Sequence, residues 1–582
     1  MKYRYFLIFL IALMGCDLQN SSKLEIPFDT NQNISADYKT SMQFYKNLAE
    51  AYPKHVALQA AGESDQGTPI HTVVIGERHK ETAHKTRRKG KVTLLINNAI
   101  HPGEPCGVDA TMLFVRELLE KRENRKALQD LTIVIIPLYN IGGTLRRNST
   151  TRANQNGPEE YGFRGNAQNL DLNRDFIKCD SKNARTFAKI FHEWKPELFL
   201  DTHTSNGADY QYTITLLGPQ HNLLPKPLSD LLKQKALPQL YEIMESKSWE
   251  MTPYVYAFST PDKGIYGFYD SPRYSMGYAA LFNCLSFTTE THMLKPFKDR
   301  VLSTKAFIES LAEFALTNKD EILDVKVKAQ SYLVDLDEYG VDWEYDFSRF
   351  DSITFKGFEA GYKTSLVSGK ERLFYNREKP YTKRIPYFNY FKPKVLVDVP
   401  NYYIVPQAAW RVVELLKLNE IKLEKLENDT VIEAEFYRIK DYETSKSPYE
   451  GHYLHSDVIV QKEVLEKQFF KGDYLIKTSQ PGFRYILETL EPQAKDAFFA
   501  WNFFDSHLQR KEYFSAYVFE DEAAEMLENN VELKNKFEHK LAKDSAFAKS
   551  ARDQLFFIYE NSSRNEGTVN LYPIARLHSS SK

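Results

Sequence analysis

Residues 92–104 read Val-Thr-Leu-Leu-Ile-Asn-Asn-Ala-Ile-His-Pro-Gly-Glu, and this segment is the strongest indication of the fold class. Its largely apolar run between polar flanks is typical of a strand that is buried on both faces of a sheet. The strand is followed directly by His101 and Glu104. In open α/β sheets, functional groups gather beyond the carboxyl ends of the strands, so we expect chemistry at this end.

The segments around this strand alternate between helical and extended patterns. A helix is predicted over 37–51 and another over 108–119, because apolar residues recur there at helical spacing. Further strands are predicted over 56–60, 70–75 and 131–138. Strands alternating with helices predict an α/β fold, with a mixed, mostly parallel sheet flanked by helices.

Two later segments place more polar residues at the same edge of the predicted sheet. The short apolar run 198–200 is followed by Asp201 and His203, and the apolar stretch 279–287 is predicted to be an interior strand that precedes Glu290. A single histidine at such a place is more often structural, and a buried glutamate can simply pair with a lysine such as Lys295. Their common position at strand ends favours a functional reading.

Together, His101, Glu104 and His203 make a chemically sufficient set of ligands for one Zn²⁺ ion per chain. Catalytic zinc takes three protein ligands with N or O donors and keeps a position open for water. Cys106 lies two residues past Glu104, but it is better explained as the start of a helix. If Cys16 is modified, only Cys106, Cys179 and Cys284 remain, and we expect them to be buried free thiols, since an odd number this small makes no disulfide framework.

Four blocks in order carry a resemblance to the zinc carboxypeptidase family, of the carboxypeptidase A type. They are the His101-Pro-Gly-Glu104 turn, residues 164–176 (Arg-Gly-Asn-Ala-Gln-Asn-Leu-Asp-Leu-Asn-Arg-Asp-Phe), Asp-Thr-His203 and Thr-Glu290-Thr-His. The resemblance runs from about residue 38 to about residue 300. It implies a zinc carboxypeptidase-like fold, metal ligation by His101, Glu104 and His203, and a peptide substrate with a free C-terminal carboxylate.

The resemblance also implies roles for residues in the second block. Asn173 and Arg174 would grip the terminal carboxylate, which a planar guanidinium can bind bidentately. Arg164 would polarise the scissile carbonyl, with Arg152 as the rival candidate, and Asp171 would orient His101.

In the family, the glutamate that matches Glu290 takes a proton from the activated water and passes it to the leaving amine. The family also carries a mobile tyrosine upstream of this glutamate. The candidates here are Tyr266, Tyr269, Tyr274 and Tyr278, and the sequence does not choose among them. The family's usual Glu-Thr-Gly is replaced by Glu290-Thr-His292, which leaves the shape of the specificity pocket open.

The first residues predict export. Lys2 and Arg4 precede an apolar stretch, and Leu-Met-Gly-Cys16 resembles a bacterial lipobox. We expect a lipoprotein signal peptide over 1–15, lipidation of Cys16 and a flexible tether over 16–35, which place the protein in the bacterial cell envelope, periplasmic or surface-exposed and held to a membrane only by its lipid anchor. An ordinary secretory signal is the alternative. The net charge of −2 offers no electrostatic case for nucleic acid.

The catalytic domain is predicted over 36–320, and an α+β accessory region over 321–582. Within the latter, residues 335–390 suggest short strands, and 407–418, 522–527 and 532–543 suggest helices. Two other functions fit the same sequence. One is zinc-dependent amide hydrolysis of peptidoglycan stem peptides or N-acyl amino acids, and the other is a non-catalytic surface lipoprotein that binds peptide or glycan through its aromatic-rich C-terminal half.

Overall fold

The computed structural model describes residues 24–77 and 81–578. The predicted signal peptide and the predicted lipidation site at Cys16 therefore lie outside the described residues. In the described part of the chain, no helix has both the length and the apolar character needed to cross a membrane.

The N-terminal half is built on an eight-stranded sheet with the strand order β1-β2-β4-β3-β5-β9-β6-β7. Its four central strands are parallel neighbours: β4 (Leu131–Ile136), β3 (Val92–Asn97), β5 (Leu198–Ser205) and β9 (Leu285–His292). Every residue of β3, β4 and β5 is buried, which explains their continuous apolar runs. The predicted mixed, mostly parallel sheet is confirmed.

The outer strands carry the antiparallel pairings. β1 (Val56–Glu63) pairs with β2 (Pro69–Ile75), which pairs with β4, and all of these contacts are antiparallel. At the other edge, β6 (Ile214–Leu217) is antiparallel to β9 and parallel to β7 (Met251–Pro253). The expected strands over 56–60 and 70–75 are therefore present and slightly longer than predicted.

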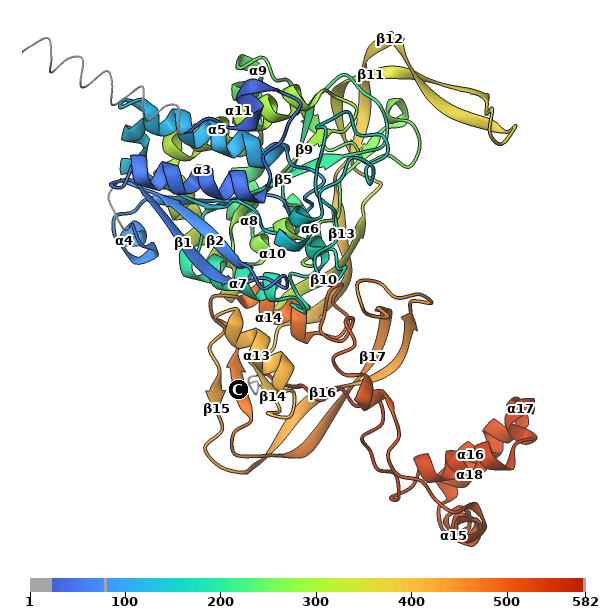
Figure 1. Ribbon diagram of the computed structural model, residues 1–582. Coiled ribbons are helices and arrows are strands. Elements are labelled where there is room, and N and C mark those ends of the chain that lie inside the picture. The colour runs from blue at the N-terminus through green and yellow to red at the C-terminus, as the bar shows by residue number, and fades with distance from the viewer. Residues whose placement is uncertain (1–23, 78–80, 579–582) are drawn as a thin grey trace, which may run out of the picture.

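Helices cover both faces of this sheet (Figure 1). α3 (Tyr38–Ala51), α5 (Cys106–Glu120) and α11 (Phe297–Thr317) share one hydrophobic core with Leu94 and Ile96. α7 (Lys182–Trp194) and α10 (Ser275–Leu281) share the other core with Leu95. Successive side chains of β3 are thus buried in the cores on opposite faces of the sheet, as the alternation of side chains along a strand requires.

One predicted strand was partly wrong. Residues 279–287 were expected to be a single interior strand, but residues 279–281 finish α10 and β9 begins only at Leu285. Every residue of α10 is buried, so the helix lacks the polar face that would mark it in a sequence.

The expected flexible tether is also corrected for its described part, residues 24–35. Leu24, Ile26 and Phe28 are buried in the core beside α5 and α11. Within α2 (Pro27–Thr30), the Asp29 carboxylate accepts hydrogen bonds of 2.6 and 2.8 Å from both terminal nitrogens of Arg116. The tether was predicted from the polar composition of the segment, but its three apolar residues, at every second position, are buried and fix it to the core.

The C-terminal half begins with α12 (Lys319–Val334) and then becomes mainly extended. β10 (Glu338–Tyr345) pairs with β13 (Phe391–Asp398), and between them β11 (Asp351–Thr364) and β12 (Glu371–Phe388) form a long hairpin. Figure 1 shows this hairpin projecting as an arm. The expected short strands over 335–390 were wrong in length, because the hairpin pairs with itself along its whole length.

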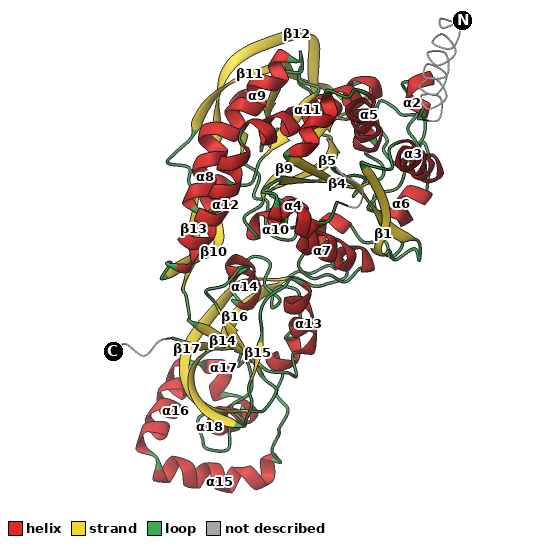
Figure 2. Cartoon of the chain, turned by 90° about the vertical axis from the view of Figure 1, so that its left-hand side faces the viewer, coloured by secondary structure: helices red, strands yellow, loops and turns green. Residues whose placement is uncertain are grey.

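A six-stranded sheet follows, in the order β15-β18-β14-β19-β16-β17. Its long strands are β16 (Thr430–Thr444) and β17 (His455–Phe469); the shorter ones are β14 (Tyr402–Val405), β15 (Glu424–Lys425), β18 (Tyr474–Lys477) and β19 (Ala575–Leu577). Two helices, α13 (Trp410–Leu418) and α14 (Phe483–Leu490), lie between this sheet and the N-terminal half (Figure 2). The predicted α+β character of this region is confirmed.

Four further helices form a separate lobe near the end of the chain (Figures 1 and 2). They are α15 (Ala516–Asn529), α16 (Val531–Lys543), α17 (Ser545–Ala548) and α18 (Ala551–Glu560), and they bury a small hydrophobic cluster of their own. The helices predicted over 407–418, 522–527 and 532–543 correspond to α13, α15 and α16.

Candidate metal centre

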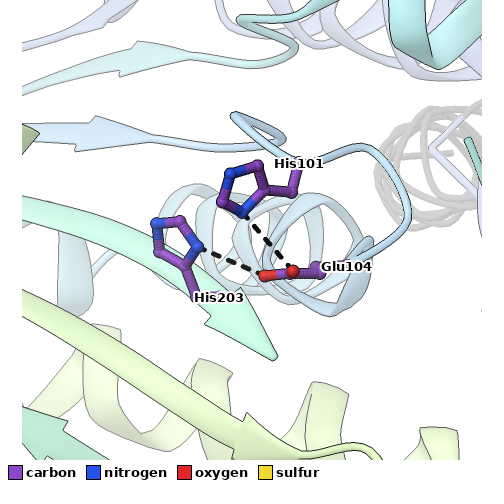
Figure 3. Close-up of side chains that lie close together, drawn as sticks. All are labelled: His101, Glu104 and His203. Carbon is purple, nitrogen blue, oxygen red and sulfur yellow. Dashed lines mark hydrogen bonds and ion pairs between the residues drawn. The ribbon is translucent and has the colours of Figure 1, made fainter. Parts of the chain in front are cut away.

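The three predicted ligands converge in the structure (Figure 3). His101 lies in the turn after β3, Glu104 lies just before α5, and His203 lies within β5 rather than after it. The Nδ1 atoms of His101 and His203 are 3.4 and 3.2 Å from the two carboxylate oxygens of Glu104. All three side chains are buried, and their ligand atoms lie within 4.8 Å of one another.

The turn that carries the first two ligands depends on a close backbone approach. The Glu104 N–H donates to the His101 carbonyl at 2.8 Å, which closes the turn. A Cβ on Gly103 would lie 2.7 Å from the Arg152 side chain and 3.2 Å from the Gly162 carbonyl. A side chain at position 103 would therefore require Arg152 and the Gly162 carbonyl to shift, which favours glycine between the two ligands.

Each histidine is held by a carboxylate on its far side. Nε2 of His101 is 2.9 Å from Asp171, as expected, and Nε2 of His203 is 3.0 Å from Asp201. Such contacts fix the ring orientation and turn the other nitrogen toward a metal. The His101 Nδ1 atom is buried and makes no hydrogen bond within the described residues. The Nδ1 atoms of the two histidines and the Glu104 carboxylate are a donor set that fits Zn²⁺.

Neighbouring charges shift the pKa values of two of the ligand residues. Burial alone would raise the pKa of Glu104, but Arg152 and His101 hold it well below its usual value. Burial alone would lower the pKa of His203, but Asp201 and Glu104 raise it well above its usual value. Asp201 and Glu104 therefore stabilise positive charge at His203, and Glu104 stays ionised as a ligand must.

Glu290 faces the same centre from the neighbouring strand. β5 and β9 run parallel, and His203 and Glu290 are direct partners in their register. Burial raises the pKa of Glu290 to about 8, and the nearby His203 opposes this rise. Its Oε2 atom makes no hydrogen bond within the described residues, and Lys295 pairs with Asp209 rather than with Glu290. A glutamate held in this way can exchange a proton near neutral pH.

Both candidate arginines reach Glu104. Arg152 donates to Glu104 at 2.7 Å, to the Thr204 carbonyl at 2.9 Å and to Gln155 at 2.7 Å, so each guanidinium nitrogen already has an acceptor. Arg164 binds Asp171 through Nε and Nη2, and its Nη1 lies 3.5 Å from Glu104. The Arg164 side chain is 45% exposed against 16% for Arg152, so Arg164 is the more available donor.

Asn173 and Arg174 follow in a short 3-10 turn, Leu172–Arg174, that Asp171 caps. The Asn173 Oδ1 atom accepts a hydrogen bond of 2.9 Å from the Ser275 N–H. The Arg174 guanidinium lies over the ring of Tyr274, 4.4 Å from its centroid. The two residues therefore stand next to the ligands with fixed orientations.

A cavity of about 400 Å³ joins these groups. It is lined by all the predicted metal, catalytic and substrate-binding residues, namely His101, Glu104, Arg164, Asn173, Arg174, His203 and Glu290, and also by Arg152. Of the four candidate tyrosines, only Tyr274 lines it. Tyr266 stacks on Phe388 instead, and His292, at the altered motif position, is fully buried and bonds to the Ala208 carbonyl.

Tyr254, Phe268 and Asp270 are among the lining residues that had not been predicted from the sequence. Tyr254 directly follows the short strand β7, which the sequence analysis did not predict, and Phe268 and Asp270 lie in a loop between β8 (Ile265–Tyr266) and α10. Burial raises the pKa of Asp270 well above its usual value, although Arg174 opposes this rise. Its Oδ2 atom makes no hydrogen bond within residues 24–77 and 81–578.

Comparisons with known proteins find similarity in the N-terminal half of the chain. Residues 41–216 match the family model described as zinc carboxypeptidase. Among solved structures, a putative carboxypeptidase A from Shewanella denitrificans OS-217 is 17% identical, with 49% of this chain and 69% of that chain covered and a TM-score of 0.37.

Two further structures are similar to the same extent. Carboxypeptidase A from Helicoverpa armigera is 17% identical, with 49% of this chain and 74% of that chain covered and a TM-score of 0.37. A metallo-carboxypeptidase from Pseudomonas aeruginosa, in complex with (2-guanidinoethylmercapto)succinic acid, is 17% identical, with 48% and 69% covered and a TM-score of 0.35.

The family match spans β1 to β6 and includes His101, Glu104 and His203 in their expected order. Residues 41–216 of this chain therefore match the zinc carboxypeptidase family, and this match supports a zinc metallopeptidase of the carboxypeptidase type.

Proposed function

We propose that this enzyme removes C-terminal residues from peptides and recognises its substrate by the free terminal carboxylate. One observation carries the proposal: Asn173 and Arg174 line the same cavity as the three zinc-ligand residues and Glu290. A guanidinium fixed beside a hydrolytic centre suits a substrate whose anionic end lies next to the bond that is cleaved.

His101, Glu104 and His203 would hold the zinc ion, which supplies a Lewis acid for water and for the scissile carbonyl. Glu290 accepts the proton of the attacking water and delivers it to the leaving amine. Arg164 donates from Nη1 to the carbonyl oxygen as negative charge develops on it, while Asp171 keeps both Arg164 and His101 in place. Arg174 and Asn173 hold the terminal carboxylate during these steps.

The cellular location is part of the same proposal. The lipobox-like Leu-Met-Gly-Cys16 supports export and lipid attachment to the bacterial cell envelope. The substrates would then be peptides of the periplasm or the cell surface.

Glu290→Gln is the first test, with zinc content measured alongside hydrolysis. We expect about one zinc per chain in both proteins, because Glu290 is not a ligand in this assignment. The variant should lose roughly 10²- to 10⁴-fold in kcat, since a general base is removed. Trimming should require a free C-terminal carboxylate and fail on amidated peptides. The matched control is Glu538→Gln, at an exposed glutamate of α16.

Two results would contradict the proposal. A protein that binds no zinc would overturn the metal site and favour a non-catalytic role. A zinc-loaded protein that leaves free-carboxylate peptides intact would overturn the substrate class and direct the search to stem peptides or N-acyl amino acids.

A further inference from the structure

A tight turn of the C-terminal half reaches the carboxylate-binding end of the cavity. β16 and β17 are connected by residues 445–454, and within this connection the Tyr449 N–H donates to the His452 carbonyl at 2.7 Å. The two central residues, Glu450 and Gly451, have φ values of 50° and 86°. Positive φ at both positions is the signature of a tight hairpin turn, which leaves Tyr449 and Glu450 little conformational freedom.

Both residues contact the segment predicted to bind substrate. The Arg174 Nε–H donates to the Tyr449 hydroxyl at 2.9 Å. The Asp171 N–H donates to the Glu450 carboxylate at 2.7 Å. These contacts join residues that are more than 270 positions apart in the chain. They bring the C-terminal half to the residues that hold His101 and the substrate carboxylate.

The aromatic side of the turn is locked in place. The Tyr449 ring is stacked on Trp501, a fully buried residue, with 6.2 Å between centroids. The Arg273 guanidinium lies over both rings, at 5.5 and 5.1 Å from their centroids. Arg273 is itself paired at 2.6 Å with the fully buried Asp496. Tyr449 is therefore a rigid hydrogen-bonding partner rather than a surface side chain that happens to be near.

The other side of the turn is held by an ion-pair network. His452 contacts the Asp180 carboxylate at 2.7 Å, and Asp180 is also bound by Lys178 at 2.9 Å. Lys178 and Asp180 directly follow the 164–176 block. The turn is thus fixed to the N-terminal half on both sides of the Arg174 contact.

Tyr449 determines which edge of Arg174 remains free. Nε is occupied by Tyr449, Nη1 donates to the Asn173 carbonyl at 2.8 Å, and Tyr274 covers one face. Within the described residues Nη2 has no hydrogen-bond acceptor. Without the Tyr449 contact, the guanidinium could turn toward Asp171, whose carboxylate is now 4.0 Å from Nη1.

From this geometry we propose that Tyr449 and Glu450 are positioning residues for substrate binding, so that both halves of the chain build one active site. The inference rests on the proposed carboxypeptidase function. Tyr449 holds Arg174 ready for the terminal carboxylate, and Glu450 fixes the backbone of Asp171. Because the carboxylate is bound before and during the reaction, loss of this positioning should appear in KM more than in kcat.

The test is Tyr449→Phe in the full-length, zinc-loaded enzyme. The change removes only the hydroxyl and keeps the ring against Trp501, so the thermal unfolding temperature should stay unchanged. We expect KM for free-carboxylate peptides to rise about tenfold, the size typical of a lost hydrogen bond to a charged group, with kcat within about twofold. The matched control is Tyr453→Phe, because Tyr453 lies in the same connection and is half exposed.

A conservative pair tests Glu450. Glu450→Gln keeps a carbonyl oxygen for the Asp171 N–H and should leave KM close to the wild-type value, whereas Glu450→Ala should raise it. Wild-type KM in both Tyr449→Phe and Glu450→Ala would overturn the inference, and so would a loss of kcat without a change in KM.

Binding to the inactive protein separates this inference from the proposed function. In a Glu290→Gln background, calorimetry can compare an acetylated dipeptide that has a free carboxylate with its amide. If the free acid binds and Tyr449→Phe weakens it about tenfold without affecting the amide, the inference is supported. If the free acid binds equally well to the Glu290→Gln protein with Tyr449 and to the one with Tyr449→Phe, the inference fails while the proposed function stands. If the acid binds no better than the amide, the proposed carboxylate recognition fails and the inference fails with it.

Discussion

Three buried carboxyl groups of this protein, Glu290, Glu488 and Asp109, have pKa values raised by burial. Burial raises the pKa of Glu290 and of Glu488 to about 8, and that of Asp109 to about 7, because the charged form loses its hydration. Of these three, Glu290 is the one that lines the cavity of the metal centre. Asp109 accepts hydrogen bonds from Ser35 and from the Ala36 N–H, and Glu488 accepts one from Tyr339. A raised pKa therefore identifies a catalytic acid or base only together with its position.

Glu488 should make the stability of the protein depend on pH. The native state keeps a proton on Glu488 up to pH 8, whereas the unfolded chain loses it near its ordinary pKa of 4.5. The unfolded state then binds fewer protons, so the free energy of unfolding falls between these values, by up to about 1.4 kcal/mol per pH unit. Glu488→Gln should flatten this decline, as measured by urea unfolding from pH 5 to 8.

Glu433→Gln is the control for this experiment, because Glu433 is an exposed residue of β16 in the same half of the chain. It should leave the pH profile as it is. A Glu488→Gln profile that is as steep as the wild-type profile would mean that other groups cause the decline.

The three ligand residues could be predicted from the sequence because His101 and Glu104 follow the apolar strand β3 and His203 lies near the end of the apolar strand β5. His101 and His203 lie at neighbouring parallel strands, and their chemical types are those of a zinc site. The partners from the C-terminal half could not be predicted, because Tyr449 and Glu450 meet Arg174 and Asp171 only through the packing of the two halves. Asp270 likewise has no local signal, since its role depends on the cavity that surrounds it.

At the scale of elements, the metal centre depends on the contact between α5 and β5. Glu104 lies just before α5, and His203 lies in β5. Gly107, in the first turn of α5, allows this contact, because a Cβ there would lie 1.9 Å from the Thr202 hydroxyl and 2.4 Å from its Cβ. The distance between two zinc ligands is thus set partly by a glycine that binds nothing.

Gly107→Ala should therefore damage both stability and metal binding. The added methyl group has no space, so α5 must shift away from β5, at a cost of about 1–3 kcal/mol in the free energy of unfolding. The shift moves Glu104 relative to His203 and should weaken zinc binding, measured by competition with a chelator. Gly218→Ala is the matched control, because its Cβ would make only ordinary contacts of 3.4 Å or more. Equal zinc affinity in the wild type and Gly107→Ala would contradict this view of the α5 contact.

Helices could be predicted where one side of the helix is buried, and strands could be predicted where both faces of the strand are buried. α3 shows helical spacing because one side is buried, and β3 and β4 are continuous apolar runs because both faces are covered. Residues 279–281, the end of α10, were predicted as part of a strand because α10 is a buried helix without a polar face. The β11–β12 arm was predicted as short strands because its length is set by pairing between its own two strands, which composition does not reveal.

At the scale of the whole molecule, the two halves share a core. The hydrophobic cluster on the α7 side of the N-terminal sheet continues into α13 and α14 of the C-terminal half. Phe282 and Tyr485 stack across this boundary with 5.6 Å between their centroids. The C-terminal half is therefore packed as part of the enzyme, in agreement with the contacts made by the Tyr449 turn.

The lobe of α15–α18, in contrast, does not share the core of the two halves. Its apolar residues cluster among themselves, apart from the shared core. The two connections to the lobe lie side by side, since the Lys511 N–H donates to the Glu566 carboxylate at 3.1 Å. Residues 513–565 can thus be replaced by a short Gly-Ser link without separating β19 from the other strands of the six-stranded sheet.

We expect the shortened enzyme to bind zinc and to keep KM and kcat within about twofold of the full chain, because an element that shares no core can be removed with little effect on the rest. As the contrasting variant, the connection 446–454 can be replaced by a two-residue turn, which deletes Tyr449 and Glu450 and should raise KM. Peptide hydrolysis by both variants checks the pair. A large loss of activity on removal of α15–α18 would show that the lobe supports the site, and an unchanged KM in the variant without the turn would contradict an active site built from both halves.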